Sequence, residues 1–307
     1  MGPISGKTID GYIIGDLLAA GGMGEIYLAA KEDDPELVVM KVVRRDLHEN
    51  PDLRKRFLRE IRLLATLQHE NVIPILDWGY KHKVLYYTMK KVDGPTLAEL
   101  IHTERFTPAA ARAILAPLAA ALDYIHSQGV MHRDVKPANV LLEPASDHWH
   151  VYLSDFGLGK NPQRDRLLPM VSRSMGTVEY MSPESVAKHP ADYRTDIYSL
   201  TAIAYEMLLG IKPHKVNKNP DGNIIPHVLL LPSLISAEFP YPLESVLIHG
   251  MQYNRDWRFQ SARAFIDAFD KALCQLTEEQ RDTRYQHIFK QNKLLAGKAL
   301  PTLDKME

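Results

Sequence analysis

One short stretch, His132 to Asn139, constrains what this chain can fold into more than any other. Its sequence, His-Arg-Asp-Val-Lys-Pro-Ala-Asn, places cationic, acidic and amide side chains within eight residues. The segment Asp155-Phe156-Gly157 begins sixteen residues beyond Asn139. A carboxylate can orient a hydroxyl nucleophile, and an amide with a second carboxylate can bind a hard cation such as Mg²⁺. The fold therefore has to hold both segments for one reaction.

Together the two segments resemble the protein-kinase signature, a catalytic loop H-R-D-x-x-x-x-N followed by D-F-G. The form Asp-x-Lys-Pro-x-Asn is similar to that of serine/threonine kinases, in particular the bacterial kinases of eukaryotic type. The resemblance implies an α+β, bilobal fold, with a five-stranded antiparallel sheet and one C helix in the N-lobe and a mainly helical C-lobe. The implied ranges are 1–92 for the N-lobe, 93–276 for the C-lobe and 277–307 for a tail or linker.

Composition and charge exclude few partners. The 37 basic and 38 acidic residues nearly cancel, so we expect neither nucleic acid nor an anionic membrane as the main partner. The start of the chain lacks a signal-peptide pattern, and no apolar run approaches the roughly 18 residues that span a bilayer. We expect a cytoplasmic chain with no membrane segment, which leaves open an anchor beyond residue 307. The single cysteine, Cys274, lies in an apolar helical pattern and is expected to be packed.

Periodicity predicts the order of the elements. Two β-prone segments, 12–18 and 25–30, flank a glycine-rich turn and predict a hairpin. Apolar run 37–43, helix 53–67 and strands 72–77 and 84–89 follow. Further helices are expected at 96–101, from Pro108 to near Gly129 with Thr107 as N-cap, from Asp196 to Leu209, and over 265–276. Segment 211–241 matches the family poorly, and it is either a private interaction surface or a packed variable loop.

The first half of the chain carries the expected nucleotide site. Lys41, inside an apolar run, is either an edge-strand charge or a buried cation with a partner. The resemblance implies the second, with Lys41 on the α- and β-phosphates and Glu60 as its partner when the helix is swung in. Met89 is the implied gatekeeper. The implied ATP-binding residues are Leu18, Ala19, Gly21, Gly22, Gly24, Ile26, Val39, Lys41, Met89, Lys90, Val92 and Leu141.

The catalytic roles follow from the same resemblance. Asp134 would orient the substrate hydroxyl, and Lys136 would supply positive charge at the transferring phosphoryl group. Asn139 and Asp155 would bind Mg²⁺ or Mn²⁺. Thr177 would contact both Asp134 and Lys136.

The resemblance also implies contacts that support the catalytic loop and a phosphorylation that switches activity. The resemblance implies that Asp196 tethers the catalytic loop and that Glu184 pairs with Arg258. Ser172 and Ser174 precede the end of the implied activation segment, and a phosphate on either would pair with Arg133. The alternative for both serines is a solvated loop position.

Two functions of different classes stay open on sequence. The first is an ATP- and Mg²⁺-dependent protein serine/threonine kinase that acts on protein substrates, activated by autophosphorylation in a transient homodimer. The second is a nucleotide-binding pseudokinase scaffold, which is supported by Ala19, Val39 and Lys90, where this chain departs from the family. The intact segment from Thr177 to Glu184 disfavours a small-molecule kinase.

Overall fold

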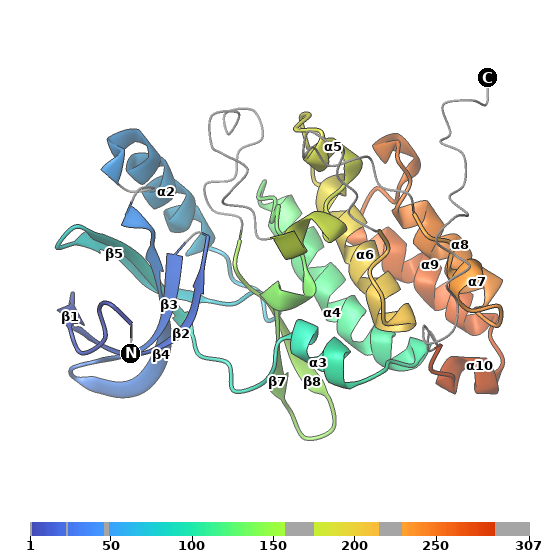
Figure 1. The fold of residues 1–307 in the computed structure, drawn as a ribbon, viewed down its shortest axis with the longest axis horizontal. Helices are drawn as coiled ribbons and strands as arrows, with labels where there is room; N and C mark the ends of the chain where they lie inside the picture. The colour runs from blue at the N-terminus through green and yellow to red at the C-terminus, as the bar shows by residue number, and fades with distance from the viewer. Residues whose placement is uncertain (1, 23, 46–48, 157–174, 215–228, 286–307) are drawn as a thin grey trace. The chain divides into compact units, whose positions relative to one another are not determined.

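The computed structural model describes residues 2–22, 24–45, 49–156, 175–214 and 229–285 (Figure 1). The chain divides into two compact units, Met1–Gly94 with Leu141–Met175, and Pro95–Val140 with Gly176–Glu307. The predicted boundary after residue 92 lies two residues from the first division. Segment 141–175, which the prediction placed in the C-lobe range, groups with the first unit.

The first unit is built on one antiparallel sheet. Its strands lie in the order β1-β2-β3-β4-β6-β5. Their bounds are β1 Thr8–Ile9, β2 Tyr12–Gly21, β3 Gly24–Lys31, β4 Asp34–Val43, β5 Ile75–Lys81 and β6 Val84–Lys90. The predicted hairpin is β2 and β3. The sheet has one strand more than the five expected, because the two residues of β1 pair with β2.

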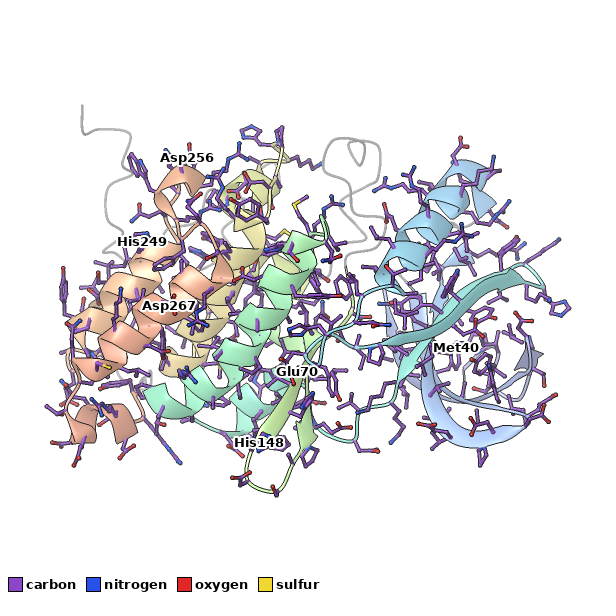
Figure 2. The ribbon with its side chains drawn as sticks, turned by 180° about the vertical axis from the view of Figure 1, so that it is seen from behind. Met40, Glu70, His148, His249, Asp256 and Asp267 are labelled. Carbon is purple, nitrogen blue, oxygen red and sulfur yellow. The ribbon has the colours of Figure 1, made fainter. Side chains whose placement is uncertain are left out.

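The two faces of this sheet differ. Side chains on one face form a buried core in which alternate residues of neighbouring strands meet, as the period of two in a strand requires. Met40 of β4, labelled in Figure 2, is fully buried in this core. The core residues are Ile9, Tyr12, Ile14, Tyr27, Ala29, Val38, Met40 and Tyr86. Lys41 and Tyr87, one position further along β4 and β6, therefore belong to the opposite face.

One helix and a hairpin complete the described part of the first unit. Helix α2 spans Pro51–Leu64, and the Asn50 side chain caps its first turn by accepting from two backbone N–H groups. The helix begins two residues earlier and ends three residues earlier than predicted. Strands β7 (Val140–Pro144) and β8 (Trp149–Leu153) form a second, two-stranded sheet. Leu153 also pairs in parallel with Val72, just before β5.

The second unit is helical. Its central helix, α6 (Arg194–Leu209), is buried at every position from Thr195 to Leu209 and ends at Gly210, whose φ of 68° suits glycine. The other helices are α3 Leu97–Thr103, α4 Pro108–Ser127, α5 Pro183–Val186, α7 Pro232–Ile235, α8 Tyr241–Gly250, α9 Ala262–Cys274 and α10 Glu278–Asp282, with 3₁₀ turns η1 Pro137–Asn139, η4 Met175–Tyr180 and η5 Arg255–Trp257. Helices α4, α6, α8 and α9 pack side by side, as Figure 1 shows.

Helix α4 confirms its predicted start. Thr107 accepts a hydrogen bond from the Ala110 N–H at 3.1 Å, and the helix continues through Pro117. Among the described residues α4 alone is long and apolar enough to cross a membrane by composition. Half of its most apolar window is buried inside the protein, against α6 and α9 among others.

The prediction for Cys274 was wrong, because its side chain is exposed. The buried positions of α9 are Ala262, Phe265, Ile266, Phe269 and Ala272. At about 100° per residue, position 274 lies roughly 200° around the helix from Ala272, on the opposite face. The apolar pattern was real, but it did not include the cysteine.

Candidate active site

Lys41, Tyr87 and Asp155 meet on the face of the first unit's sheet that lies opposite the core around Met40. Strand register places Lys41 opposite Tyr87 of β6 and opposite Ile26 of β3. Lys41 Nζ lies 2.7 Å from Asp155 Oδ1, and the two side chains are 12% and 23% exposed. Burial lowers the pKa of Lys41, but the contacts with Tyr87 and Asp155 raise it by a larger amount, so the pKa lies above its ordinary value. The ammonium is therefore charged, and Lys41 lies on an interior strand with a carboxylate partner, Asp155, whereas its contact with the α- and β-phosphates stays a prediction.

Glu60 lies on α2 and has a different partner. Its Oε1 accepts from Arg56 Nε at 2.8 Å, an i,i+4 pair on the same helix face. Lys41 is paired with Asp155. The expected Lys41–Glu60 pair, conditional on the position of the helix, stays a prediction.

The other predicted nucleotide residues fall on the elements around this face. Val39 is opposite Met89 in the register of β4 and β6, two residues along from the Lys41–Tyr87 pair, so these four share one face. Leu18, Ala19 and Gly21 are on β2, Gly22 is in the turn, Gly24 and Ile26 are on β3, Met89 and Lys90 are on β6, Val92 follows β6, and Leu141 is on β7. The glycine-rich hairpin and the strands beside it thus have the expected order.

Gly24 has a structural reason to be glycine. A Cβ at this position would lie 2.0 Å from the Val42 carbonyl oxygen, and the φ of Gly24 is +155°. Gly21 has no atom within 4 Å of such a Cβ. Close strand approach therefore requires glycine at position 24, whereas a side chain at position 21 would meet no neighbouring atom.

Lys90, an expected ATP-binding residue at which this chain departs from the family, contacts the second hairpin. Its Nζ lies 2.8 Å from Glu143 Oε2 of β7 and 2.8 Å from the Tyr152 hydroxyl of β8. The hydrogen bond from Lys90 holds the pKa of Glu143 below its ordinary value. Its side chain therefore links the end of β6 to β7, a contact that no local sequence pattern predicts.

The catalytic loop, in the second unit, is ordered by its own polar groups. Lys136 Nζ lies 3.0 Å from Asp134 Oδ2. The Asn139 amide nitrogen, on η1, donates to the Asp134 carbonyl oxygen at 2.8 Å and to Asp134 Oδ2 at 3.2 Å. Lys136 and Asn139 thus both bind Oδ2 of Asp134, which restricts the direction of the carboxylate.

Asp196, on α6, supports this loop from beneath, as predicted. Its two carboxylate oxygens accept the backbone N–H groups of His132 and Arg133, each at 2.8 Å. His126 Nε2 of α4 lies 2.9 Å from the same carboxylate. Burial raises the pKa of Asp196, but its interactions, first of all the hydrogen bond with His126, lower it by a larger amount, so the pKa lies below its ordinary value. The role of His126 was missed on sequence, where it is one polar residue in an apolar helix.

Two site residues have left-handed backbone. The φ angles of Arg133 and Asp155 are +62° and +56°. Such values are uncommon outside glycine and cluster at functional sites, where surrounding contacts hold them. The hydrogen bond from the Arg133 N–H to Asp196 is one such contact.

The end of the expected activation segment is anchored by a buried ion pair. Arg258 donates from both terminal nitrogens to Glu184, at 2.8 and 2.7 Å, which confirms the predicted pairing. Burial raises the pKa of Glu184, but the hydrogen bonds from Arg258 bring it below its ordinary value. Ser172, Ser174 and the side chain of Thr177 lie outside the described residues.

Among the described residues no group of three or more His, Cys, Asp or Glu side chains could bind a metal ion. Asn139 and Asp155 nevertheless offer the oxygen donors that Mg²⁺ prefers, and Mg²⁺ commonly takes only one or two protein carboxylates beside phosphate oxygens and water. The donor chemistry of these two residues therefore fits the ion that the family uses.

Comparisons with known proteins agree with this geometry. The model of the protein kinase domain family matches residues 12–292. Among curated relatives, the serine/threonine-protein kinase PknE of Mycobacterium bovis is 33% identical over 271 residues, covering 88% of this chain and 47% of the relative. PknH of the same organism is 34% identical over 275 residues, covering 87% and 45%.

The chain thus spans about half the length of these curated relatives. Among solved structures, the kinase domain of Mycobacterium tuberculosis PknI has a TM-score of 0.69 at 30% identity, covering 87% of this chain and 98% of that one. Fold, motif order and family match all agree, and this chain belongs to the protein kinase domain family.

Proposed function

We propose that this chain transfers the γ-phosphoryl group of ATP to serine or threonine hydroxyls of proteins. The observation that carries the proposal is the catalytic loop, in which Lys136 and Asn139 hold Asp134 and Asp196 fixes the backbone. The curated relatives carry the name serine/threonine-protein kinase. Lys136 in the Asp-x-Lys-Pro-x-Asn loop supports the same acceptor class.

The chemistry assigns one role to each polar group. The substrate hydroxyl donates to Asp134, and its oxygen forms a bond to the γ-phosphorus as the bond to the leaving oxygen of ADP breaks. The hydroxyl proton passes late to Asp134, which therefore orients the nucleophile more than it activates it. Lys136 stabilises the negative charge on the transferring group.

Asn139 and Asp155 are proposed to bind Mg²⁺, and a bound Mg²⁺ would neutralise charge on the phosphates. Lys41 would contribute a second cation to the α- and β-phosphates. The side chains of Ile26, Val39 and Met89, on the same face of the sheet as Lys41, would contact the adenine. In these assignments polar side chains bind the metal ion and the phosphates, and apolar side chains bind the adenine.

Regulation by phosphorylation is part of the proposal. A phosphate on Ser172 or Ser174 would pair with Arg133, whose backbone is already fixed by Asp196. Two copies of the chain would exchange phosphate in trans during a transient encounter. Phosphopeptide mapping after incubation with Mg-ATP tests this point, and full activity of the double Ser172→Ala, Ser174→Ala variant would overturn it.

Transfer of labelled phosphate from ATP to a generic protein substrate tests the activity itself. We expect transfer by the wild type and its loss, by at least about a hundredfold, in Asp134→Asn. Asp147→Asn is the matched control, because Asp147 is a fully exposed aspartate in the β7–β8 turn. A wild-type protein that binds nucleotide but transfers no phosphate would favour the pseudokinase scaffold.

A further inference from the structure

Tyr87 brings a hydroxyl group into the buried Lys41–Asp155 contact. Its side chain is almost fully buried, at 3% exposure, and strand register sets it directly across from Lys41. Its hydroxyl donates to Asp155 Oδ1 over a long 3.4 Å, and its proximity to Lys41 raises the pKa of that ammonium. One phenol therefore touches both charged groups of the pair.

A tyrosine hydroxyl suits this bridge because it can accept and donate at once. It donates to the Asp155 carboxylate, which is an acceptor only, and its oxygen can still accept from the Lys41 ammonium, which is a donor only. Phenylalanine would fill the same volume and could do neither. The hydroxyl, and not the ring, is thus what ties Lys41 and Asp155 to β6.

The ring of Tyr87 makes a second connection. It packs on Phe57 of α2, with ring centroids 6.2 Å apart. Phe57 is three residues before Glu60, the expected partner of Lys41, on the same helix face. Arg56, the neighbour of Phe57, holds Glu60 at 2.8 Å. Tyr87 therefore contacts Lys41, Asp155 and the helix that carries Glu60.

The atoms engaged by Tyr87 are those that Mg-nucleotide would need. The proposed function gives Asp155 oxygens to Mg²⁺ and Lys41 Nζ to the phosphates. Contacts that a protein must release on binding lower the affinity for the ligand, by linkage. The hydroxyl of Tyr87 strengthens the contact between Lys41 and Asp155, which Mg-nucleotide would have to break on binding.

We propose that Tyr87 is a positioning residue that restrains Lys41 and Asp155 against each other and thereby raises the concentration of Mg-nucleotide that this chain requires. The inference rests on the proposed function for the identity of the ligand. A single long hydrogen bond between a phenol and a carboxylate corresponds to about a two- to fivefold change in affinity.

Tyr87→Phe tests the proposal, with binding of Mg-ADP measured by isothermal titration calorimetry. We expect the dissociation constant to fall about two- to fivefold, KM for ATP to fall by the same factor and kcat to change less than about twofold. The unfolding midpoint without nucleotide should fall, and its rise on addition of Mg-ADP should be larger than in the wild type.

Tyr86→Phe is the matched control. Tyr86 is the adjacent residue of β6, equally buried, and its hydroxyl donates to Asp10 at 2.7 Å on the other face of the sheet. Its removal should leave the affinity for Mg-ADP unchanged.

An unchanged or weaker affinity in Tyr87→Phe, or an equal gain in Tyr86→Phe, would overturn the proposal. A wild type that binds Mg-ADP without transferring phosphate would defeat the proposed function, while the binding measurement would still decide the role of Tyr87.

Discussion

The Glu184–Arg258 pair allows a quantitative prediction, because it is much more buried than the surface ion pairs of the second unit. The Arg258 side chain is 0% exposed and that of Glu184 is 11% exposed. Substitution Glu184→Gln removes the charge and leaves a buried guanidinium. Breaking a buried pair by removing one partner costs about 3–5 kcal/mol.

The lower part of that range applies here, because Arg258 keeps other partners. Its side chain donates to the carbonyl oxygens of Gln252 and Tyr253 at 2.7 and 3.1 Å, and it lies over the ring of Tyr198. We therefore expect Glu184→Gln to lower the free energy of unfolding by about 3 kcal/mol. Urea unfolding would show this as a midpoint lower by roughly 1 M or more.

The matched control is Asp267→Asn. Asp267 of α9, labelled in Figure 2, pairs with Arg263 at the same 2.7 Å, but the two side chains are 46% and 77% exposed. Exposed i,i+4 pairs contribute only about 0.3–0.5 kcal/mol. Equal losses in the two variants would refute the reasoning that burial, and not distance, sets the value of these pairs.

Acid gives an independent check on the same pair. The pKa of Glu184 in the folded protein lies below its ordinary value of 4.5. A lowered folded pKa contributes stability that is present above the unfolded pKa and is lost as the pH falls through the folded pKa. The difference between wild type and Glu184→Gln should therefore be constant near neutral pH and shrink below about pH 4.5.

Three further predictions concern other parts of the chain. Asp196→Ala should lower the unfolding free energy by about 2–6 kcal/mol, because it leaves two loop N–H groups without their acceptor, and should abolish phosphate transfer; urea unfolding and the labelled-ATP assay check this. Gly24→Ala should lower the thermal midpoint by several degrees, whereas Gly21→Ala should stay within about 2 °C, and equal shifts would contradict the Cβ geometry. Lys90→Met should change the unfolding free energy by less than about 1 kcal/mol, since Lys90 and Glu143 are 35% and 28% exposed, and a larger loss in urea unfolding would contradict this.

Local signals predicted much of the fold. Thr107 and Pro108 marked the start of α4, and Gly210 marked the end of α6, because caps and left-handed positions admit few residue types. The motifs of the family gave the contacts of Asp196 and Glu184 by position. These features depend on chemistry that a short window of sequence carries.

Other features depend on tertiary pairing and left no local trace. Tyr86 and Tyr87 are adjacent and identical, yet one hydroxyl meets Asp10 and the other meets Lys41 and Asp155. Only the register of β4 and β6 decides between them. The Arg56–Glu60 pair, by contrast, did have a local signal, because the two residues are four apart in the predicted helix. The two-residue strand β1 was too short to give a periodic signal.

The first unit consists of two separate stretches of the chain, and this limits where the chain can be truncated. The backbone of residues 71–73 pairs with Leu153, through Ile73 N to Leu153 O at 3.0 Å and Leu153 N to Asn71 O at 2.8 Å. A fragment that stops at Gly94 would lack this partner strand and leave those groups exposed to water. During synthesis the unit closes only after the intervening residues 95–140 have emerged, so its completion awaits a long-range contact. Truncation at Gly94 would therefore also remove Asp155, the partner of Lys41, so the six-stranded sheet keeps this contact only in a chain that extends beyond residue 155.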